Sequence, residues 1–180
     1  MIADPAFDRR LELARAGDPQ AWAEIYDSLA PKLLGYLRAK GAAEPEDVLG
    51  EVFVQAVRDL GSFDGSEREL RAWVFSIAHH RLIDAARRGA RRPATSMPPE
   101  EIALLSGSGN VEDEAMARID AGEVTRMLAL LSDDQRTVLL LRIIGGFTVD
   151  EVARTIGKRA GAVKQLQRRG LAAMRKAKER

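Results

Sequence analysis

Apolar residues recur along the chain at intervals of three and four, the spacing that places them on one side of an α-helix. No segment alternates with a period of two over the length of a strand. The pattern of hydrophobic and polar positions therefore predicts an all-α protein.

Three helices are predicted in the N-terminal half. Asp18 and Pro19 form a cap followed by a proline at the first helical position, which opens a helix that ends near Gly41. A second helix runs from Pro45 to about Leu60, and a third from about Arg68 to Arg88. The packing stripe of the third contains Leu70, Trp73, Val74 and Ile77.

The C-terminal part contains two capping boxes, in which a serine or threonine is followed three residues later by glutamine or glutamate. These are Ser132 with Gln135 and Thr148 with Glu151. They predict helices at 133–144 and 149–156, and the paired glycines 145–146 end the first of them. A turn around Gly157 leads to a last, basic helix from about residue 161. Two short helices and a glycine turn before a basic helix are typical of a helix-turn-helix.

A segment rich in proline, glycine and serine separates the two halves at residues 89–110. Unstructured loops of this length are uncommon inside compact domains, so we interpret it as a flexible linker. The predicted architecture is two small helical domains, residues 1–88 and 111–180, and a helix at about 111–131 begins the second.

Charge is divided unevenly along the chain. Residues 1–88 carry 12 basic and 15 acidic side chains, whereas residues 132–180 carry 12 basic and 5 acidic ones. This asymmetry indicates a polyanion-binding module joined to a domain that binds by other means. The chain contains no cysteine and begins without a secretory pattern, so we expect a cytoplasmic protein without a membrane segment.

The basic helix carries side chains that suit DNA. Gln165 and Arg168 are residue types that read adenine or guanine edges, while Lys158, Arg159 and Lys164 suit phosphate oxygens. Val163, Leu166, Gly170 and Met174 lie on the opposite side and are expected to pack inward. The predicted interface comprises Lys158, Arg159, Lys164, Gln165, Arg168 and Arg169.

This C-terminal run resembles region 4 of bacterial sigma factors, especially the two-domain extracytoplasmic-function (ECF) group of the sigma-70 family. The ordered matches are Leu131, Gln135-Arg136, Leu141-Arg142, Glu151-Val152-Ala153, Gly157 and Val163-Lys164. The resemblance implies that the basic helix binds the −35 promoter element.

The N-terminal half resembles region 2 of the same family, in the runs PEDVLGEVFVQAV and RAWVFSIAHHRLIDAARR. The sequence departs from the family pattern at four positions: Gly50, Val57, Leu70 and His80 stand where the family often has Gln, Trp, Phe and Asn. The resemblance implies a promoter-specific initiation factor that binds core RNA polymerase, recognises −35 and −10 elements and assists promoter melting.

The resemblance also implies particular contacts. The −10 DNA is expected to meet the third helix and the preceding loop through Ser62, Asp64, Ser76, His79, His80 and Arg87. The β′ clamp helices of the polymerase are expected to meet the exposed face of the second helix, at Asp47, Glu51, Val54 and Arg58. Its buried face is predicted to include Val48, Leu49, Val52, Phe53, Ala56 and Val57. The β flap and an anti-sigma factor are further implied partners.

Two alternatives stay open from the residues. A helix-turn-helix regulator without a polymerase role would usually dimerise, but the N-terminal half shows no heptad seam. A metal-dependent hydrolase would use His79, His80 and Asp84, and all its remaining ligands would have to be carboxylates because the chain has two histidines. Promoter melting needs no nucleophile, metal or other cofactor, so we expect neither catalysis nor a cofactor.

Overall fold

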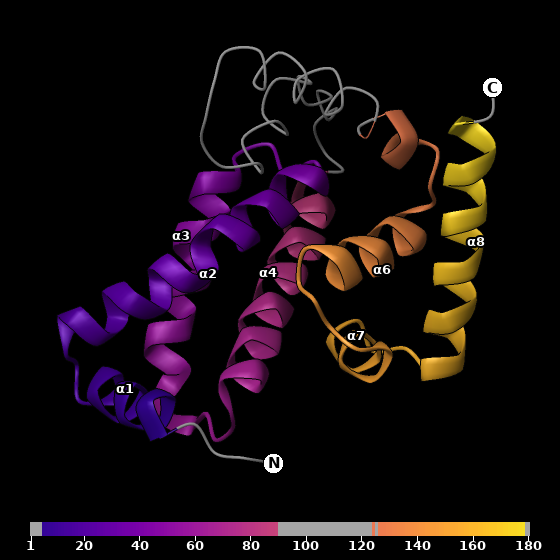
Figure 1. The fold of residues 1–180 in the computed structure, drawn as a ribbon. Helices are drawn as coiled ribbons and strands as arrows, with labels where there is room; N and C mark the ends of the chain where they lie inside the picture. The colour runs from indigo at the N-terminus through magenta and orange to yellow at the C-terminus, as the bar shows by residue number, and fades with distance from the viewer. Residues whose placement is uncertain (1–4, 90–123, 125, 179–180) are drawn as a thin grey trace, which may run out of the picture.

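The computed structural model describes residues 5–89, 124 and 126–178, and every regular element among them is helical (Figure 1). The predicted helical class is confirmed. The elements are α1 (Pro5–Arg15), α2 (Pro19–Ala39), α3 (Pro45–Asp59), the 3-10 turn η1 (Leu60–Ser62), α4 (Glu67–Gly89), α6 (Asp133–Ile143), α7 (Val149–Thr155) and α8 (Ala160–Lys178).

Helices α2, α3 and α4 form the N-terminal bundle at nearly the predicted positions. The Asp18 side chain accepts a hydrogen bond from the Ala21 amide at 2.8 Å, and so caps α2 as its sequence predicts. Leu33, Tyr36 and Leu37 of α2 are completely buried. The side of α2 that they share is the centre on which α3 and α4 pack.

Helix α1 is absent from the predicted elements. It buries Phe7, Leu11 and Ala14, and the Trp22 indole of α2 donates a hydrogen bond to the Ala14 carbonyl at 2.9 Å. An isolated helix of 11 residues is marginal in water. Packing on α2 therefore stabilises α1 more than its own sequence does.

The C-terminal helices follow the predicted pattern closely. Both capping boxes are present, with Ser132 and Gln135 at the start of α6 and Thr148 and Glu151 at the start of α7. Gly146 and Gly157 adopt the left-handed backbone that favours glycine, which ends α6 and α7 where expected.

The linker prediction and most of the predicted helix 111–131 lie outside the described residues. Residues 126–129 are helical, in agreement with the end of that predicted helix. The boundaries of the two predicted domains stay a prediction.

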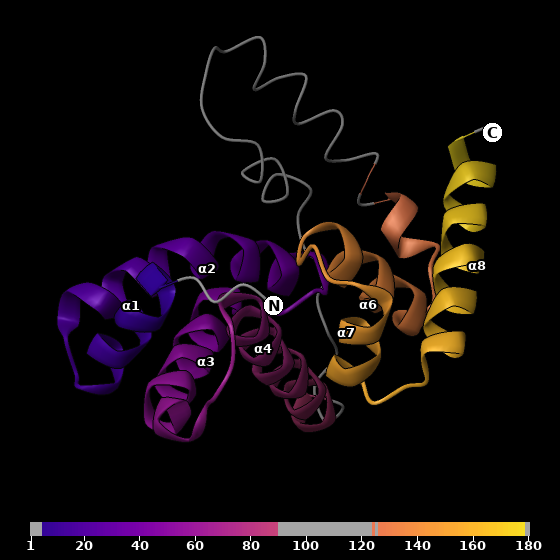
Figure 2. The same ribbon diagram turned by 60° about the horizontal axis from the view of Figure 1, so that its bottom comes forward.

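The two sets of helices pack against each other, with α7 beside α4 and α6 beside the end of α2 (Figures 1 and 2). Phe147 is fully buried at this junction, and its ring meets the Phe75 ring of α4 edge-on at a centroid distance of 5.1 Å. The guanidinium of Arg71 lies 6.0 Å from the Phe147 centroid. The hydrophobic core therefore continues from one half of the chain into the other.

A polar pair lies in this core. The Tyr36 hydroxyl and Nδ1 of His79 are 3.1 Å apart and share a hydrogen bond. Burial lowers the pKa of His79 to about 4, and the nearby positive charges of Lys40 and His80 act in the same direction. Burial raises the pKa of Tyr36 far above its ordinary range, so the phenol keeps its proton. His79 is thus neutral in the folded protein near pH 7.

We expect the free energy of unfolding to fall as the pH is lowered from 7 to 5. In this range His79 takes up a proton in the unfolded chain, whereas it stays neutral in the folded chain. The contribution of His79 to the free energy of unfolding is complete above pH 6.5 and is lost as the pH approaches 4. Between these values the free energy of unfolding changes by up to about 1.4 kcal/mol per pH unit. Urea unfolding at several pH values, compared between the parent chain and His79→Gln, measures it. Equal slopes for the two proteins would contradict this assignment.

Two glycines give opposite expectations for alanine substitution. A Cβ on Gly145 would lie 2.6 Å from the Leu141 carbonyl oxygen and 2.7 Å from the Phe147 ring, whereas a Cβ on Gly50 would have nothing within 4 Å. Gly145→Ala should cost about 1–3 kcal/mol through overpacking. Gly50→Ala, inside α3, should stabilise by up to about 1 kcal/mol through helix propensity. Urea unfolding followed by circular dichroism distinguishes the two, and a neutral Gly145→Ala would argue against this packing.

Candidate nucleic-acid interface

The exposed side of α8 carries a continuous basic face. Lys164, Gln165, Arg168 and Arg169 are all exposed on the helix, and Arg159 is exposed just before it. Helix α8 lies at the edge of the molecule away from α1–α4 in both views (Figures 1 and 2). The structure therefore leaves the predicted DNA-reading side chains open to a large partner.

Helix α8 is held firmly on α6 by its apolar side. Val163 is fully buried, and Leu166 and Met174 pack on the core. Gly170 brings the two helices close together, because a Cβ there would lie 2.9 Å from Cδ1 of Leu139. The predicted inward side is confirmed, and the basic residues project from a rigid support.

Lys158 differs from the other predicted DNA contacts because its ammonium is already paired. Its Nζ lies 2.9 Å from Oδ2 of Asp134, and the two side chains are 35% and 52% exposed. Such an exposed pair contributes little to stability and is easily exchanged for another anion. A DNA phosphate could therefore take the place of Asp134.

Glu151 fixes the start of α7 and links it to α4. One carboxylate oxygen accepts hydrogen bonds from the Thr148 amide at 2.6 Å and from the Thr148 hydroxyl at 2.9 Å. Arg68 of α4 approaches the other oxygen at 2.5 Å. Burial raises the pKa of Glu151, but the hydrogen bonds from Arg68 and Thr148 outweigh this effect and lower it to about 2. The carboxylate stays ionised and holds both helices.

The predicted polymerase-binding face of α3 is exposed. Asp47, Glu51, Val54 and Arg58 all reach solvent, and the Val54 side chain is 71% exposed. Val57 was expected on the buried side, but it is 52% exposed. The expectation for Val57 was wrong because the buried stripe of α3 is narrower than the predicted one. Its buried residues include Leu49, Val52, Phe53 and Ala56. Helix α3 therefore exposes two valines, Val54 and Val57, where the sequence pattern predicted only the first to be exposed.

The residues predicted to meet −10 DNA fall into two groups. Ser62, Asp64, His80 and Arg87 are exposed. Ser76 is half-buried and donates a hydrogen bond to the Trp73 carbonyl at 2.6 Å, while His79 is buried at 8% exposure. His79 was expected on an open arc of α4, but it is buried and hydrogen-bonded to Tyr36 of α2.

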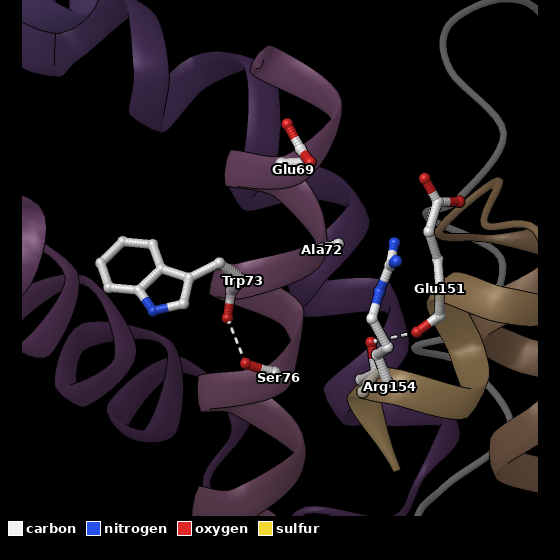
Figure 3. A pocket seen from close by; sticks show the side chains of 7 residues that line it. Glu69, Ala72, Trp73, Ser76, Glu151 and Arg154 are labelled. Carbon is white, nitrogen blue, oxygen red and sulfur yellow. Dashed lines mark hydrogen bonds between the residues drawn. The ribbon is translucent and has the colours of Figure 1, made fainter. Parts of the chain in front are cut away.

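A crevice of about 350 Å³ lies where α4 faces α7 (Figure 3). Glu69, Ala72 and Ser76 line it from α4, and Arg154 and Thr155 line it from α7. The Trp73 indole points to the other side of α4 from Arg154. It stacks on Phe63 at a centroid distance of 5.3 Å. Trp73 is thus a packing residue, half-buried at the edge of the core, as its place in the apolar stripe predicts.

In the parts of the chain that the structure describes, no three His, Cys, Asp or Glu side chains converge as metal ligands would. His79 is engaged by Tyr36 instead. Among the helices of the same described residues, none is both long and apolar enough to cross a lipid bilayer.

Comparison with known families and proteins agrees with this geometry. The family model for sigma-70 region 2 matches residues 25–92, and that for sigma-70 region 4 matches residues 121–174. The ECF RNA polymerase sigma factor ShbA of Streptomyces griseus is 32% identical over 168 residues, covering 88% of each chain. The ECF sigma factor SigD of Mycobacterium tuberculosis is 34% identical over 167 residues, covering 88% of this chain and 77% of its own.

Solved structures share the fold over nearly the whole chain. CnrH, in complex with the cytosolic domain of CnrY, aligns with a TM-score of 0.68 and 21% identity over 97% of each chain. RpoE from Bartonella quintana, in complex with the anti-sigma factor NepR, aligns with a TM-score of 0.63 and 19% identity over 98% of each. Both family regions are matched in their expected order, and two relatives exceed 30% identity over most of the chain. The chain therefore belongs to the ECF RNA polymerase sigma factors of the sigma-70 family.

Proposed function

We propose that this chain is a promoter-specific initiation factor that binds core RNA polymerase, reads a −35 element through α8 and helps to open the −10 element. The observation that carries the proposal is the exposed basic face of α8, held rigidly on a capped helix-turn-helix in a member of the sigma-70 family. A helix of this kind fits the major groove of duplex DNA.

Two kinds of side chain contact the −35 element: those that read base edges and those that bind phosphates. Gln165 and Arg168 are exposed on α8 and of a type that hydrogen-bonds base edges. Lys158, Arg159 and Lys164 neutralise phosphates and fix the register of the helix, and Arg169 extends the same face.

At the −10 element the protein acts by capturing unstacked bases. Ser62 and Asp64 lie before α4, His80 and Arg87 lie exposed on it, and Ser76 lines the crevice. Each captured base offsets an unpairing cost of a few kcal/mol. No covalent chemistry is needed, so the protein acts as an initiation factor and not as an enzyme.

The α3 face is proposed to contact the β′ clamp helices, and region 4 the β flap. Val54 supplies exposed apolar surface between the charges of Glu51 and Arg58, which suits a protein contact better than contact with water. An anti-sigma factor is a further proposed partner, because the related RpoE was solved in complex with one. We place the protein in the cytoplasm, where core polymerase and DNA are.

A second candidate is a DNA-binding regulator that acts without polymerase. The helix-turn-helix alone supports it, because such modules serve many proteins. Purified protein that protects a palindromic site on DNA and fails to bind core polymerase would favour this candidate.

Run-off transcription tests the proposed function directly. The purified chain, mixed with bacterial core RNA polymerase and fragmented genomic DNA from its source, should yield discrete transcripts that core enzyme alone does not produce. Mapping their 5′ ends should reveal shared −35 and −10 sequences upstream. An absence of factor-dependent transcripts would overturn the proposal.

Two substitutions on the −35 side should separate base reading from phosphate binding. Arg168→Ala should lose about 1–3 kcal/mol of discrimination at one base pair, which flattens the preference among −35 variants. Lys158→Ala should weaken binding to all of them alike and lower the salt dependence by about one counterion. Equilibrium binding of holoenzyme to a set of −35 variants at several salt concentrations measures both. Equal, sequence-independent losses would contradict the division of roles.

Val54→Lys should weaken binding to core polymerase, because it places a strongly hydrated charge in an apolar contact. We expect an increase of tenfold or more in Kd, which corresponds to about 1.4 kcal/mol. Leu13→Lys is the matched control, since Leu13 is an exposed aliphatic residue of α1, outside this face. The two variants should fold alike by circular dichroism. If both weakened polymerase binding equally, the α3 face would not be the contact.

A further inference from the structure

Helix α1 is fixed to the N-terminal bundle at its last turn. The Ala14 carbonyl accepts two hydrogen bonds, one from the Trp22 indole at 2.9 Å and one from the Gly17 amide at 3.0 Å. Leu11 and Ala14 are buried in the core. Arg15, the last residue of α1, is exposed and therefore extends from a firmly held position.

The Arg15 side chain reaches from α1 to residues 63–66, which connect η1 to α4 and are called the α3–α4 loop. Its Nη2 donates a hydrogen bond to the main-chain carbonyl of Phe63, 48 residues further along the chain. Figure 1 shows α1 and the connection from α3 to α4 at the same end of the bundle. One charged side chain thus joins this loop to a helix that is distant in sequence.

The same loop is also held from the side of α4. The Phe63 ring stacks on the Trp73 ring at a centroid distance of 5.3 Å. The Ser66 amide and hydroxyl donate hydrogen bonds to Oε2 of Glu69, at 2.9 and 2.8 Å, which caps the start of α4. A Cβ on Gly65 would lie 3.0 Å from the Phe63 ring and 3.1 Å from Glu69, so the loop is closely packed.

A loop that is held on two sides presents its outer surface in one shape. Phe63, Gly65 and Ser66 are half-buried, whereas Asp64 is exposed. Under the proposed function this loop meets the opened −10 strand. A site that is already ordered captures a base without the entropic cost of ordering its own backbone. The hydrogen bond from Arg15 therefore favours base capture without any contact between Arg15 and the base.

We propose that α1 contributes to −10 recognition and that Arg15 is a positioning residue, which holds the α3–α4 loop ready for an unstacked base of the −10 strand. The inference rests on the proposed function for the role of the loop, but the contact between Arg15 and the loop stands independently of it. The sequence match to sigma-70 region 2 begins at residue 25, so it does not include this helix. Arg15 acts through the Phe63 carbonyl and not by binding a DNA phosphate.

Amide hydrogen exchange in the free chain, resolved by NMR, tests whether Arg15 holds the loop. The Phe63 amide donates a hydrogen bond to the Leu60 carbonyl at 3.1 Å. It should exchange about fivefold faster in Arg15→Gln, because the loop loses a charged hydrogen bond and opens more often. Arg10→Gln is the matched control, since Arg10 lies on the same helix but pairs with Glu24 at 2.7 Å. Circular dichroism checks that both variants keep their helix content. Unchanged exchange at Phe63 in Arg15→Gln would overturn the proposal.

Promoter opening by the holoenzyme tests the role of this contact in −10 recognition. Arg15→Gln should slow the step from closed to open complex about fivefold, which corresponds to about 1 kcal/mol, because the loop has the required shape for less of the time. Binding to core polymerase and to the closed promoter should stay the same. A fluorescent base analogue in the −10 element follows opening by stopped flow. An opening rate equal to those of the parent chain and Arg10→Gln would contradict the inference.

Two further measurements distinguish positioning from phosphate binding. Loss of a phosphate contact would lower the salt dependence of promoter binding by about one counterion, whereas Arg15→Gln should leave it unchanged. Arg15→Gln should also reduce the difference in opening rate between −10 sequences, because a loose loop distinguishes bases poorly. A lower salt dependence together with an unchanged base preference would show that Arg15 binds DNA directly and is not a positioning residue.

Phe63→Leu loosens the same loop from the side of α4 without removing a charge, since it deletes the ring that stacks on Trp73. Because both contacts are needed to hold the loop, this change should slow opening by a similar factor. The double variant Arg15→Gln with Phe63→Leu should lose less than the product of the two separate losses. Losses that multiply would mean that the two residues act independently, which is incompatible with the proposal.

The outcomes separate this inference from the proposed function. A parent chain that opens no promoter with core polymerase would overturn both. A parent chain that opens promoters, with an Arg15→Gln variant that opens them equally well, would overturn the inference alone and leave the proposed function intact.

Discussion

The arrangement of the C-terminal helices depends on the carboxylate of Glu151. A buried carboxylate must have its charge and its lone pairs satisfied, and here Thr148 and Arg68 do so from two different parts of the chain. The hydrogen bonds from Thr148 determine where α7 begins. The pair with Arg68 determines which side of α7 faces α4, so local folding and the contact between the halves depend on one side chain.

The features that the sequence predicted well are those with local causes. The capping boxes at Ser132 and Thr148, the proline at the start of α2 and the glycine ends of α6 and α7 each depend on residues a few positions apart. The exposed basic face of α8 follows equally from helical periodicity. Family resemblance added the order of the two regions, which the comparisons confirm.

The features that the sequence did not predict depend on residues that lie far apart in the chain. Helix α1 depends on packing against α2, and the burial of His79 depends on the packing of α4 against α2, where Tyr36 meets its ring. Lys40 and Asp133 are 93 residues apart, and each is, in sequence, an ordinary surface charge. Nothing in their neighbourhoods indicates that they pair, because the pair is created by the relative placement of α2 and α6. The exposure of Val57 was misjudged for a similar reason, since the width of a buried stripe is set by its neighbours.

The low pKa values of His79 and Glu151, about 4 and about 2, have a physiological consequence. In the folded chain neither group changes its charge between pH 6 and 8, so mild acidification leaves the charge of this junction unchanged. The unfolded chain does change, because His79 there regains the basicity of an ordinary imidazole. Acid therefore destabilises the fold without protonating it, since the proton binds to chains that have already unfolded and withdraws them from the folding equilibrium.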